Sequence, residues 1–180
     1  ILNNDKYFEL KFATILRDKK EDRIPVSSTA NRTTSNLFGS FDSSFSEFFN
    51  LNYDFALDND FNKLNHNSIN AEFSINNIVT NFNFIEQNAE IGDTNVLENT
   101  TTINFDENNS LAFKTRRNRK ISLTEYYDLV YEYQNDCLTA AVKYKKTYYQ
   151  DRDLKPKEDL FFTITLFPIT TLDQKIDNDL

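Results

Sequence analysis

The feature that most constrains the fold is an alternation of apolar and polar residues that repeats in three successive segments between residues 126 and 169. The third segment places Leu160, Phe162, Ile164 and Leu166 at every second position, with threonines between the last three of them. Because successive side chains of a β-strand point to opposite faces, this spacing predicts strands with one apolar and one polar face. A tilted strand of about 9 to 11 residues crosses a membrane. The pattern therefore favours an all-β fold of antiparallel transmembrane β-barrel strands.

The same alternation extends over the rest of the chain. In the first two segments the apolar faces are formed by Tyr127, Leu129, Tyr131 and Tyr133, and by Leu138, Ala140, Val142 and Tyr144. The pattern predicts about ten up-and-down strands, at roughly residues 6–16, 36–43, 48–58, 67–75, 78–87, 99–106, 110–117, 122–134, 137–150 and 159–168.

The expected connections alternate in length. Short turns are expected at 44–47, 76–77, 107–109 and 135–136, and longer polar connections at 17–35, 59–66, 88–98, 117–121 and 151–158. Short turns on one side and long loops on the other are typical of bacterial outer-membrane barrels. A soluble β-sandwich is the alternative, but it gives no reason for this regularity.

The composition favours a barrel over a soluble domain with a large core. Hydrophobic residues make up 39% of the 180 residues and the mean hydropathy is -0.62, which is low for a chain that buries much apolar surface. With only 2 glycines and 3 prolines, turns must be built from Asn, Asp and Ser. No apolar run approaches the roughly 18 residues of a spanning helix. No linker or repeat divides the chain, so residues 1–180 are expected to form one section of a barrel domain.

The net charge bears on the class of partner, and the first residues bear on whether the chain is part of a longer protein. A net charge of -8 and a pI of about 4.7 disfavour nucleic acid as a partner, because nucleic-acid binders gain affinity by neutralising phosphates. The chain begins at Ile1 without a methionine and shows no basic-then-apolar leader. We therefore expect a mature product or a piece of a longer protein, and favour the piece.

Residues that could support catalysis are sparse. The only histidine, His66, is expected in a solvated loop. A hydrolase site with Ser68 as nucleophile is the alternative, but nothing in the spacing brings a base and an orienting group to it. No Cys/His cluster suggests a metal. We therefore expect no enzymatic activity and no cofactor.

Charged residues gather on the face opposite the apolar stripe. Lys114, Arg116, Asp128, Lys143 and Lys145 share this alternation and are expected to face a lumen. There they could donate hydrogen bonds to phosphate or sugar groups of a passing substrate. Pairing of these charges with one another, as in most barrels, is the alternative.

The turn expected at Asn135-Asp136 predicts a register for its hairpin. The resulting pairs are Gln134 with Cys137, Asp128 with Lys143, and Leu129 with Val142. Cys137 is the only cysteine, so it has no disulfide partner within the chain. With the C-terminus on the periplasmic side, Cys137 directly follows a turn in an oxidising compartment. A small inert strand residue and a thiol paired elsewhere both stay open at this point.

Three stretches near the C-terminus resemble the lipopolysaccharide-assembly outer-membrane protein (LptD) family, also called the organic solvent tolerance protein family. They are YEYQNDCLTA at 131–140, YYQDRDLKP at 148–156 and LFFTITL at 160–166. Upstream, SST at 27–29 and SNLFG at 35–39 are similar to that family's passage from loop to strand. The resemblance is sharp over about residues 122 to 168 and diffuse before them.

The resemblance implies the C-terminal section of a large barrel in the outer membrane of a Gram-negative bacterium, preceded by a periplasmic N-terminal domain. Such a barrel delivers lipopolysaccharide to the outer leaflet. Its implied partners are lipopolysaccharide, outer-membrane lipids, a lipoprotein plug inside the barrel and periplasmic bridge proteins bound through the N-terminal domain. It also implies a disulfide between Cys137 and the missing N-terminal part. Well-studied members have two adjacent cysteines there, whereas this chain has Asp136-Cys137-Leu138, so the number of bridges stays open.

The resemblance further implies a seam between the first and last strands that opens sideways. One side of it is expected at Phe162, Ile164, Thr165, Leu166 and Pro168. Pro168 has no backbone N–H to donate, which would weaken the edge; the alternative is that it merely ends the strand. The function expected from the sequence is assembly and translocation of lipopolysaccharide through a conduit with a lateral gate. A passive porin and a soluble acidic β-domain that binds a partner are the alternatives.

Overall fold

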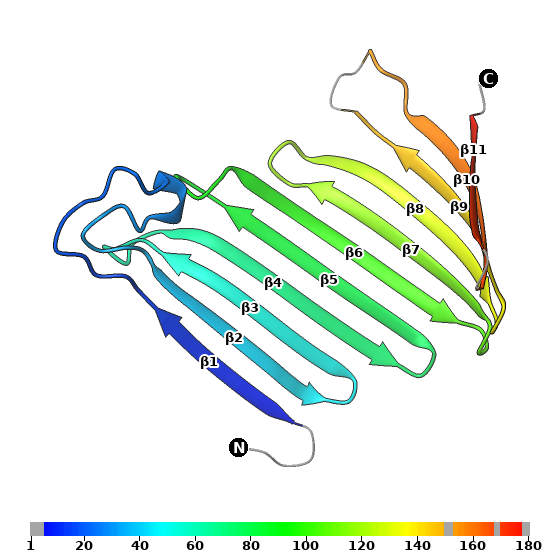
Figure 1. Ribbon diagram of the computed structural model, residues 1–180, viewed down its shortest axis with the longest axis horizontal. Coiled ribbons are helices and arrows are strands. Elements are labelled where there is room, and N and C mark those ends of the chain that lie inside the picture. The colour runs from blue at the N-terminus through cyan, green and yellow to red at the C-terminus, as the bar shows by residue number, and fades with distance from the viewer. Residues whose placement is uncertain (1–5, 150–152, 168–169, 178–180) are drawn as a thin grey trace. The chain divides into compact units, whose positions relative to one another are not determined.

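A computed structural model describes residues 6–149, 153–167 and 170–177, the last of these by their backbone alone. The described residues form eleven β-strands, which neighbour one another in chain order in one antiparallel sheet (Figure 1). The strands are β1 (Tyr7–Ala13), β2 (Leu37–Ser46), β3 (Phe49–Leu57), β4 (Leu64–Ile75), β5 (Ile78–Gln87), β6 (Thr94–Asn104), β7 (Asn109–Asn118), β8 (Leu123–Gln134), β9 (Leu138–Thr147), β10 (Lys157–Leu166) and β11 (Thr170–Asp177), and a short 3-10 helix, η1, spans Val26–Ser28. The all-β, up-and-down fold is confirmed. β1 and β11 end the strand order, so the described residues do not close the sheet into a barrel.

All ten predicted strands are present, and an eleventh follows them. β4 begins at Leu64 rather than at 67, and β6 begins at Thr94 rather than at 99. The early residues of both strands are mostly polar, and backbone pairing does not require an apolar side chain, so a hydropathy pattern misses them. The hydropathy pattern did not predict β11 for the same reason, since only Leu172 and Ile176 among its eight residues are apolar. No helix in the described part of the chain is long and apolar enough to span a membrane.

The connections follow the predicted alternation with one exception. Figure 1 shows the strands as a series of hairpins. The connections at one end of the hairpins are 47–48, 76–77, 105–108, 135–137 and 167–169, and those at the other end are 14–36, 58–63, 88–93, 119–122 and 148–156. The exception is 119–122, which is no longer than 105–108. The described residues with left-handed backbone all lie in connections, and they are Thr29, Phe61, Asn76, Ala89 and Ser122. The turns are thus built without glycine in this conformation, though not from polar residues alone.

The chain divides into two compact units. Unit 1 comprises residues 1–73 and 82–97, and unit 2 comprises residues 74–81 and 98–180. Unit 1 holds β1 to β3 and most of β4 and β5, whereas unit 2 holds β7 to β11 and most of β6. The prediction that residues 1–180 form one domain stays a prediction.

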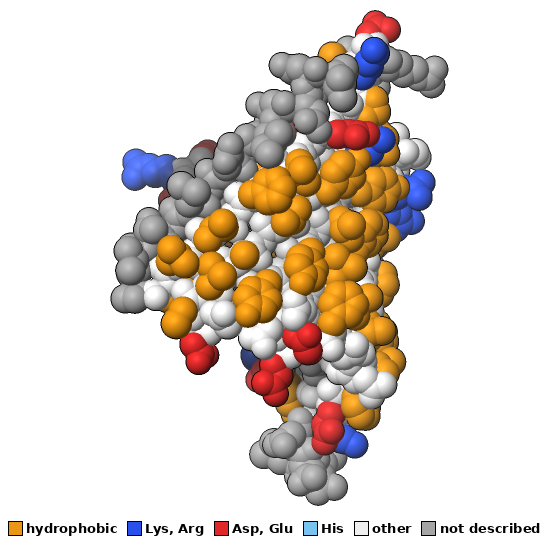
Figure 2. Space-filling model, turned by 90° about the vertical axis from the view of Figure 1, so that its right-hand side faces the viewer, with side chains coloured by type: hydrophobic (Ala, Val, Ile, Leu, Met, Phe, Trp, Pro, Cys, Tyr) orange, Lys and Arg blue, Asp and Glu red, His pale blue; other side chains and the backbone are white. Residues whose placement is uncertain are grey.

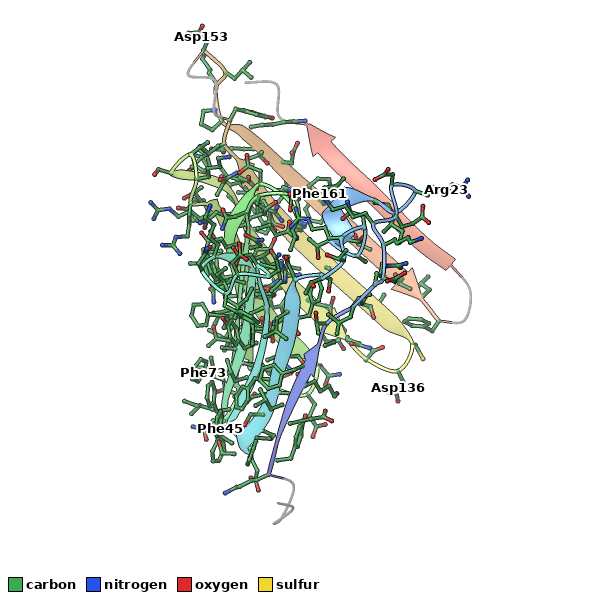
Figure 3. All side chains as sticks on the ribbon, turned by 90° about the vertical axis from the view of Figure 1, so that its left-hand side faces the viewer. Arg23, Phe45, Phe73, Asp136, Asp153 and Phe161 are labelled. Atoms are coloured by element: carbon green, nitrogen blue, oxygen red, sulfur yellow. The ribbon has the colours of Figure 1, made fainter. Side chains whose placement is uncertain are left out.

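In unit 1 the long connection between β1 and β2 is folded rather than extended. The backbone N–H of Ser35 donates to the carbonyl of Ile15 at 3.0 Å, and the N–H of Asn36 donates to Thr29 Oγ1 at 3.1 Å. Thr29, Ser35 and Asn36 are almost fully buried, as are Ala30 and Ala56. Figure 3 shows this connection, marked by Arg23, on the opposite side of the strands from Phe45 and Phe73. The connection therefore packs against one face of unit 1.

In unit 2 the β8–β9 hairpin differs from the predicted register by two residues. The observed pairs include Asp128 with Lys145, Leu129 with Tyr144, and Gln134 with Thr139. The cause is the side chain of Asn135, whose Oδ1 accepts hydrogen bonds from the N–H groups of Cys137 at 2.9 Å and Leu138 at 2.8 Å. Asn135 therefore takes the first position of the turn, and Asp136 and Cys137 become its central residues. Because the shift is even, every side chain keeps its predicted face.

β10 is not the last strand of the chain. It pairs with β9 on one side and β11 on the other, so that Leu166 lies opposite both Leu138 and Thr170. The prediction that the strand at 159–168 ends the sheet, and so forms one side of a seam, is therefore wrong. Within this chain the outer strand is β11. Pro168 lies outside the described residues.

Candidate membrane-facing surface

The apolar residues of unit 2 form regular rows across β7 to β10. Within a row, each residue lies directly opposite its neighbour on the next strand. The first row is Phe113, Leu129, Tyr144 and Leu160, the second is Leu111, Tyr131, Val142 and Phe162, and the third is Tyr133, Ala140 and Ile164. We call these residues the apolar face of unit 2. The alternation in the sequence thus predicted correctly which side chains share a face.

The apolar face of unit 2 is more exposed than the polar face behind it. Leu129 and Phe162 keep 42% and 39% of their surface accessible, whereas Asp128 and Asp159 on the other face keep 4% and 8%. Soluble domains show the reverse order, since burial of apolar surface drives folding and charged side chains are seldom fully buried. Figure 2 shows apolar side chains gathered on the face that it presents. An apolar surface of this kind marks a contact with a membrane or another protein.

Charged residues mark the end of the apolar face towards the long connections. The row that follows Leu129 on this side consists of Tyr127, Lys146 and Glu158. The Lys146 ammonium lies 2.7 Å from the Glu158 carboxylate. This ion pair lies on the same face as the apolar rows, and the apolar face ends there.

Tyrosine hydroxyls mark the other end, near the short turns. The hydroxyl of Tyr131 donates to Asn109 Oδ1 at 2.5 Å, and Asn135 Nδ2 donates to the hydroxyl of Tyr133 at 3.1 Å. Each ring therefore joins the apolar face while its hydroxyl bonds to an asparagine side chain in or beside a short turn, which is how tyrosine sits at a membrane interface. From Tyr127 to Tyr133 a strand rises about 20 Å along its own axis, so a tilted strand keeps these rows within the apolar band of about 25 Å in outer-membrane barrels.

Unit 1 has an exposed apolar face of its own. Leu10, Phe41, Tyr53 and Ile69 form one row across β1 to β4. The adjacent row on the opposite face is Glu9, Asp42, Asn52 and Asn70. Large apolar side chains of the edge strand β1, among them Phe8 and Phe12, are exposed. Each unit thus separates apolar from polar side chains in the same manner.

A chain of aromatic rings runs across the apolar face of unit 1. Ring centroids are 6.3 Å apart for Phe41 and Phe45, 5.5 Å for Phe45 and Phe49, 4.6 Å for Phe49 and Phe73, and 6.4 Å for Phe73 and Phe82. Figure 3 shows Phe45 and Phe73 on the same side of the strands. Aromatic girdles of this type flank the apolar band of outer-membrane barrels.

Gly39 makes room for a further aromatic contact on this face. It lies between Phe12 of β1 and Phe55 of β3, whose ring centroids are 6.2 Å apart at an interplanar angle of 69°. A Cβ atom at Gly39 would overlap the Phe55 ring. The two rings therefore close over the glycine and cover the backbone that it leaves bare.

The five charged residues expected to share a face in unit 2 do so. Lys114, Asp128, Lys145 and Asp159 are direct neighbours on β7 to β10, so their charges alternate in sign. Lys143 lies diagonally from Asp128, and its Nζ is 2.9 Å from Asp128 Oδ2. The predicted contact between Asp128 and Lys143 thus exists, although the two residues are not directly opposite. Whether this face lines a lumen stays a prediction.

Arg116, the fifth of these residues, is held by two acids that the sequence did not indicate. Its Nη1 is 2.5 Å from Glu98 and its Nε is 2.6 Å from Glu125. The register shifts between Arg116 and Arg117, which leaves Glu125 without an opposite residue. Because a local irregularity makes this contact possible, alternation alone could not predict it. These pairs support the alternative in which polar-face charges bind one another.

His66 is not a loop residue. It belongs to β4, lies opposite Ala56, and its Nδ1 is buried without a hydrogen-bond partner. Ser68 lies on the same face, opposite Asp54. Among the described residues no hydrogen bond joins Ser68 to His66, and this contact is what a hydrolase site would need. Because Asn65 and His66 at the start of β4 are polar, the hydropathy pattern predicted a later start for this strand and placed His66 in a loop.

Cys137 is exposed in the β8–β9 turn with a free thiol. It is a central residue of that turn rather than the first residue after it. Its position leaves the sulfur accessible to a partner. The disulfide with an N-terminal part stays a prediction.

The residues expected at the seam divide between the two faces of β10. Phe162, Ile164 and Leu166 are exposed on the apolar side, whereas Thr165 lies opposite Thr139. Their exposure fits the apolar face better than a strand edge.

No protein-family model matches the chain, and no curated protein matches it. In the described part of the chain no group of three or more His, Cys, Asp or Glu side chains is placed to hold a metal ion. The resemblance to the LptD family therefore rests on the sequence stretches quoted above.

Proposed function

We propose that this chain is a membrane-embedded section of a β-barrel, and that it serves lipopolysaccharide assembly in the outer membrane of a Gram-negative bacterium. One observation carries the membrane part: unit 2 exposes Leu129 and Phe162 while it buries Asp128 and Asp159. This order is unfavourable in water and favourable where the apolar face meets hydrocarbon.

The open ends of the strand order support a section rather than a complete barrel. Among the described residues, β1 pairs only with β2, and β11 only with β10. Unpaired backbone N–H and C=O groups are costly in hydrocarbon, because no water is present to bond them. In a membrane, both outer edges require a pairing partner, which further strands of the full-length protein or, for the purified chain, a second copy supplies.

The assembly of lipopolysaccharide is supported by the resemblance and by the chemistry of the polar face. Lys114 is exposed there, and Lys143 and Lys145 lie on the same face of the neighbouring hairpin. Ammonium groups pair with phosphate oxygens and donate to sugar hydroxyls. The protein acts as a conduit rather than a catalyst in this proposal.

Refolding into lipid vesicles tests the membrane part. We expect the purified chain to gain β-structure only with vesicles or detergent, and to change its electrophoretic migration on heating. A chain that folds as a monomer in buffer alone would favour the soluble acidic β-domain instead.

Photo-crosslinking in the full-length protein tests the cargo. A benzophenone amino acid placed at Glu132, on the polar face, is expected to form an adduct with lipopolysaccharide. The control is the adjacent Tyr133, which lies on the apolar face at the short-turn end, where the inner leaflet contains phospholipid. Absence of the adduct at Glu132 would favour a passive porin.

A further inference from the structure

A pocket of about 440 Å³ lies in unit 1, where η1 of the long connection approaches the polar face of the strands. Its polar lining consists of Lys11, Ser27, Ser28, Ser40, Asp54, His66 and Gln87, contributed by β1 to β5 and η1. Phe38 and Ile91 add apolar wall. Pockets for small molecules range from about 300 to 1,000 Å³ and combine apolar walls with a few placed polar groups.

One polar atom of this pocket is buried without a partner within the described protein. His66 Nδ1 is buried and accepts or donates no hydrogen bond. Asp54 lies directly opposite Ser40 and is exposed, so its carboxylate is accessible to a ligand. A buried polar atom without a partner costs free energy, so His66 Nδ1 points to something that the protein binds.

The charges select the class of ligand. Lys11 forms an ion pair with Glu9, at 2.6 Å between Nζ and Oε2, and so already has a carboxylate partner. An anionic ligand would meet the Asp54 carboxylate. A metal ion would find too few ligands, because the described residues contain no group of three or more His, Cys, Asp or Glu side chains that could hold one. A neutral molecule with several hydroxyl groups can bond to the Asp54 carboxylate, to His66 Nδ1 and to the Ser40 hydroxyl, since a hydroxyl both donates and accepts.

We propose that this pocket binds a neutral sugar unit. Its hydroxyls bond to the Asp54 carboxylate, to His66 Nδ1 and to the Ser40 hydroxyl, and its C–H face rests on Phe38 and Ile91. The pocket lies wholly within unit 1, and this inference does not depend on where the apolar faces reside.

Saturation-transfer NMR with the full chain tests the proposal. The chain is folded in lauryldimethylamine oxide micelles, a detergent without a sugar headgroup. The probes are the methyl glycosides of glucose, galactose and mannose, N-acetylglucosamine, and glucose 6-phosphate. At least one neutral sugar is expected to bind. Binding should weaken about tenfold in Asp54→Asn and in His66→Ala, as expected when one hydrogen bond to a charged or buried group is lost.

Two variants serve as controls. Asp42→Asn removes a carboxylate from the same face of β2 outside the pocket lining and should leave binding unchanged. His66→Gln keeps a polar side chain and replaces His66→Ala if that variant does not fold, as judged by circular dichroism. The proposal is overturned if no neutral sugar binds, if the pocket variants bind as well as the parent chain, or if glucose 6-phosphate binds more tightly than the neutral sugars.

Discussion

A lysine at Val142 should destabilise the sheet in a bilayer far more than a lysine one residue earlier. Val142 lies in a central row of the apolar face, between Tyr131 and Phe162, and is 37% exposed. Ala141 points to the opposite face, where Glu132 is its direct neighbour on β8. The two substitutions therefore add the same charge to the same strand on opposite sides.

The expected magnitude follows from the depth of Val142. Its row lies two residues from the row of Tyr133 and four from that of Tyr127, which is about 7 Å and 13 Å along the strand. Lysine on a lipid-facing site costs about 2–4 kcal/mol at the bilayer midplane and about 0–1 kcal/mol near the interfaces. We expect a loss of about 2 kcal/mol for Val142→Lys. For Ala141→Lys we expect a change below about 1 kcal/mol, because the new ammonium faces Glu132.

Urea titration in phosphatidylcholine vesicles, followed by circular dichroism and by the heat-dependent gel shift, measures both variants. The midpoint should fall for Val142→Lys and stay near that of the parent chain for Ala141→Lys. Equal losses, or a larger loss at Ala141, would refute the assignment of faces to lipid and lumen.

Three further outcomes test local features of the structure. Gly39→Ala should lower the free energy of unfolding by about 1–3 kcal/mol, because the new methyl group overlaps the Phe55 ring, and Phe55→Leu should restore part of the loss. Hydrogen bonds from the Asn109 side chain and from backbone N–H groups hold the pKa of the Asp106 carboxyl below its ordinary value, so this turn should lose stability as the pH falls through the lowered pKa. An NMR titration should show the pKa of Asp106 rising in Asn109→Ala, and an unchanged value would contradict the assignment. Asn135→Ala should speed amide hydrogen exchange in the β8–β9 turn and cost about 0.5–1.5 kcal/mol, whereas unaltered exchange would show that the turn does not depend on this side chain.

Alternation predicted the strands and their faces because a strand has a period of two residues whatever its partner. The β8–β9 hairpin shows the limit of that argument. Its faces were right, but its register was not, because the Asn135 side chain selects which residues occupy the turn. A hydropathy pattern contains no information on such a bond.

Other features depended on polar residues that carry no periodic signal. β11 and the first residues of β4 are mostly polar, and His66 was therefore assigned to a loop. The pocket beside His66 brings together β1, β3, β4 and the long connection, which no spacing along the chain reveals. Arg116 contacts Glu125 because the register shifts beside it, and it contacts Glu98 on β6. Alternation along the chain predicts neither contact.

The contact between the apolar face and lipid is tested most directly by two adjacent tryptophans. The chain has no tryptophan, so Phe161→Trp and Phe162→Trp each introduce a single fluorophore into β10. Phe162 lies opposite Val142 on the apolar face, whereas Phe161 lies opposite Lys143 on the polar face. In vesicles of phosphatidylcholine with brominated acyl chains, fluorescence of the Phe162→Trp variant should be strongly quenched, and that of the Phe161→Trp variant should not. Equal quenching of the two variants, or stronger quenching of Phe161→Trp, would contradict the proposal that this face meets the membrane.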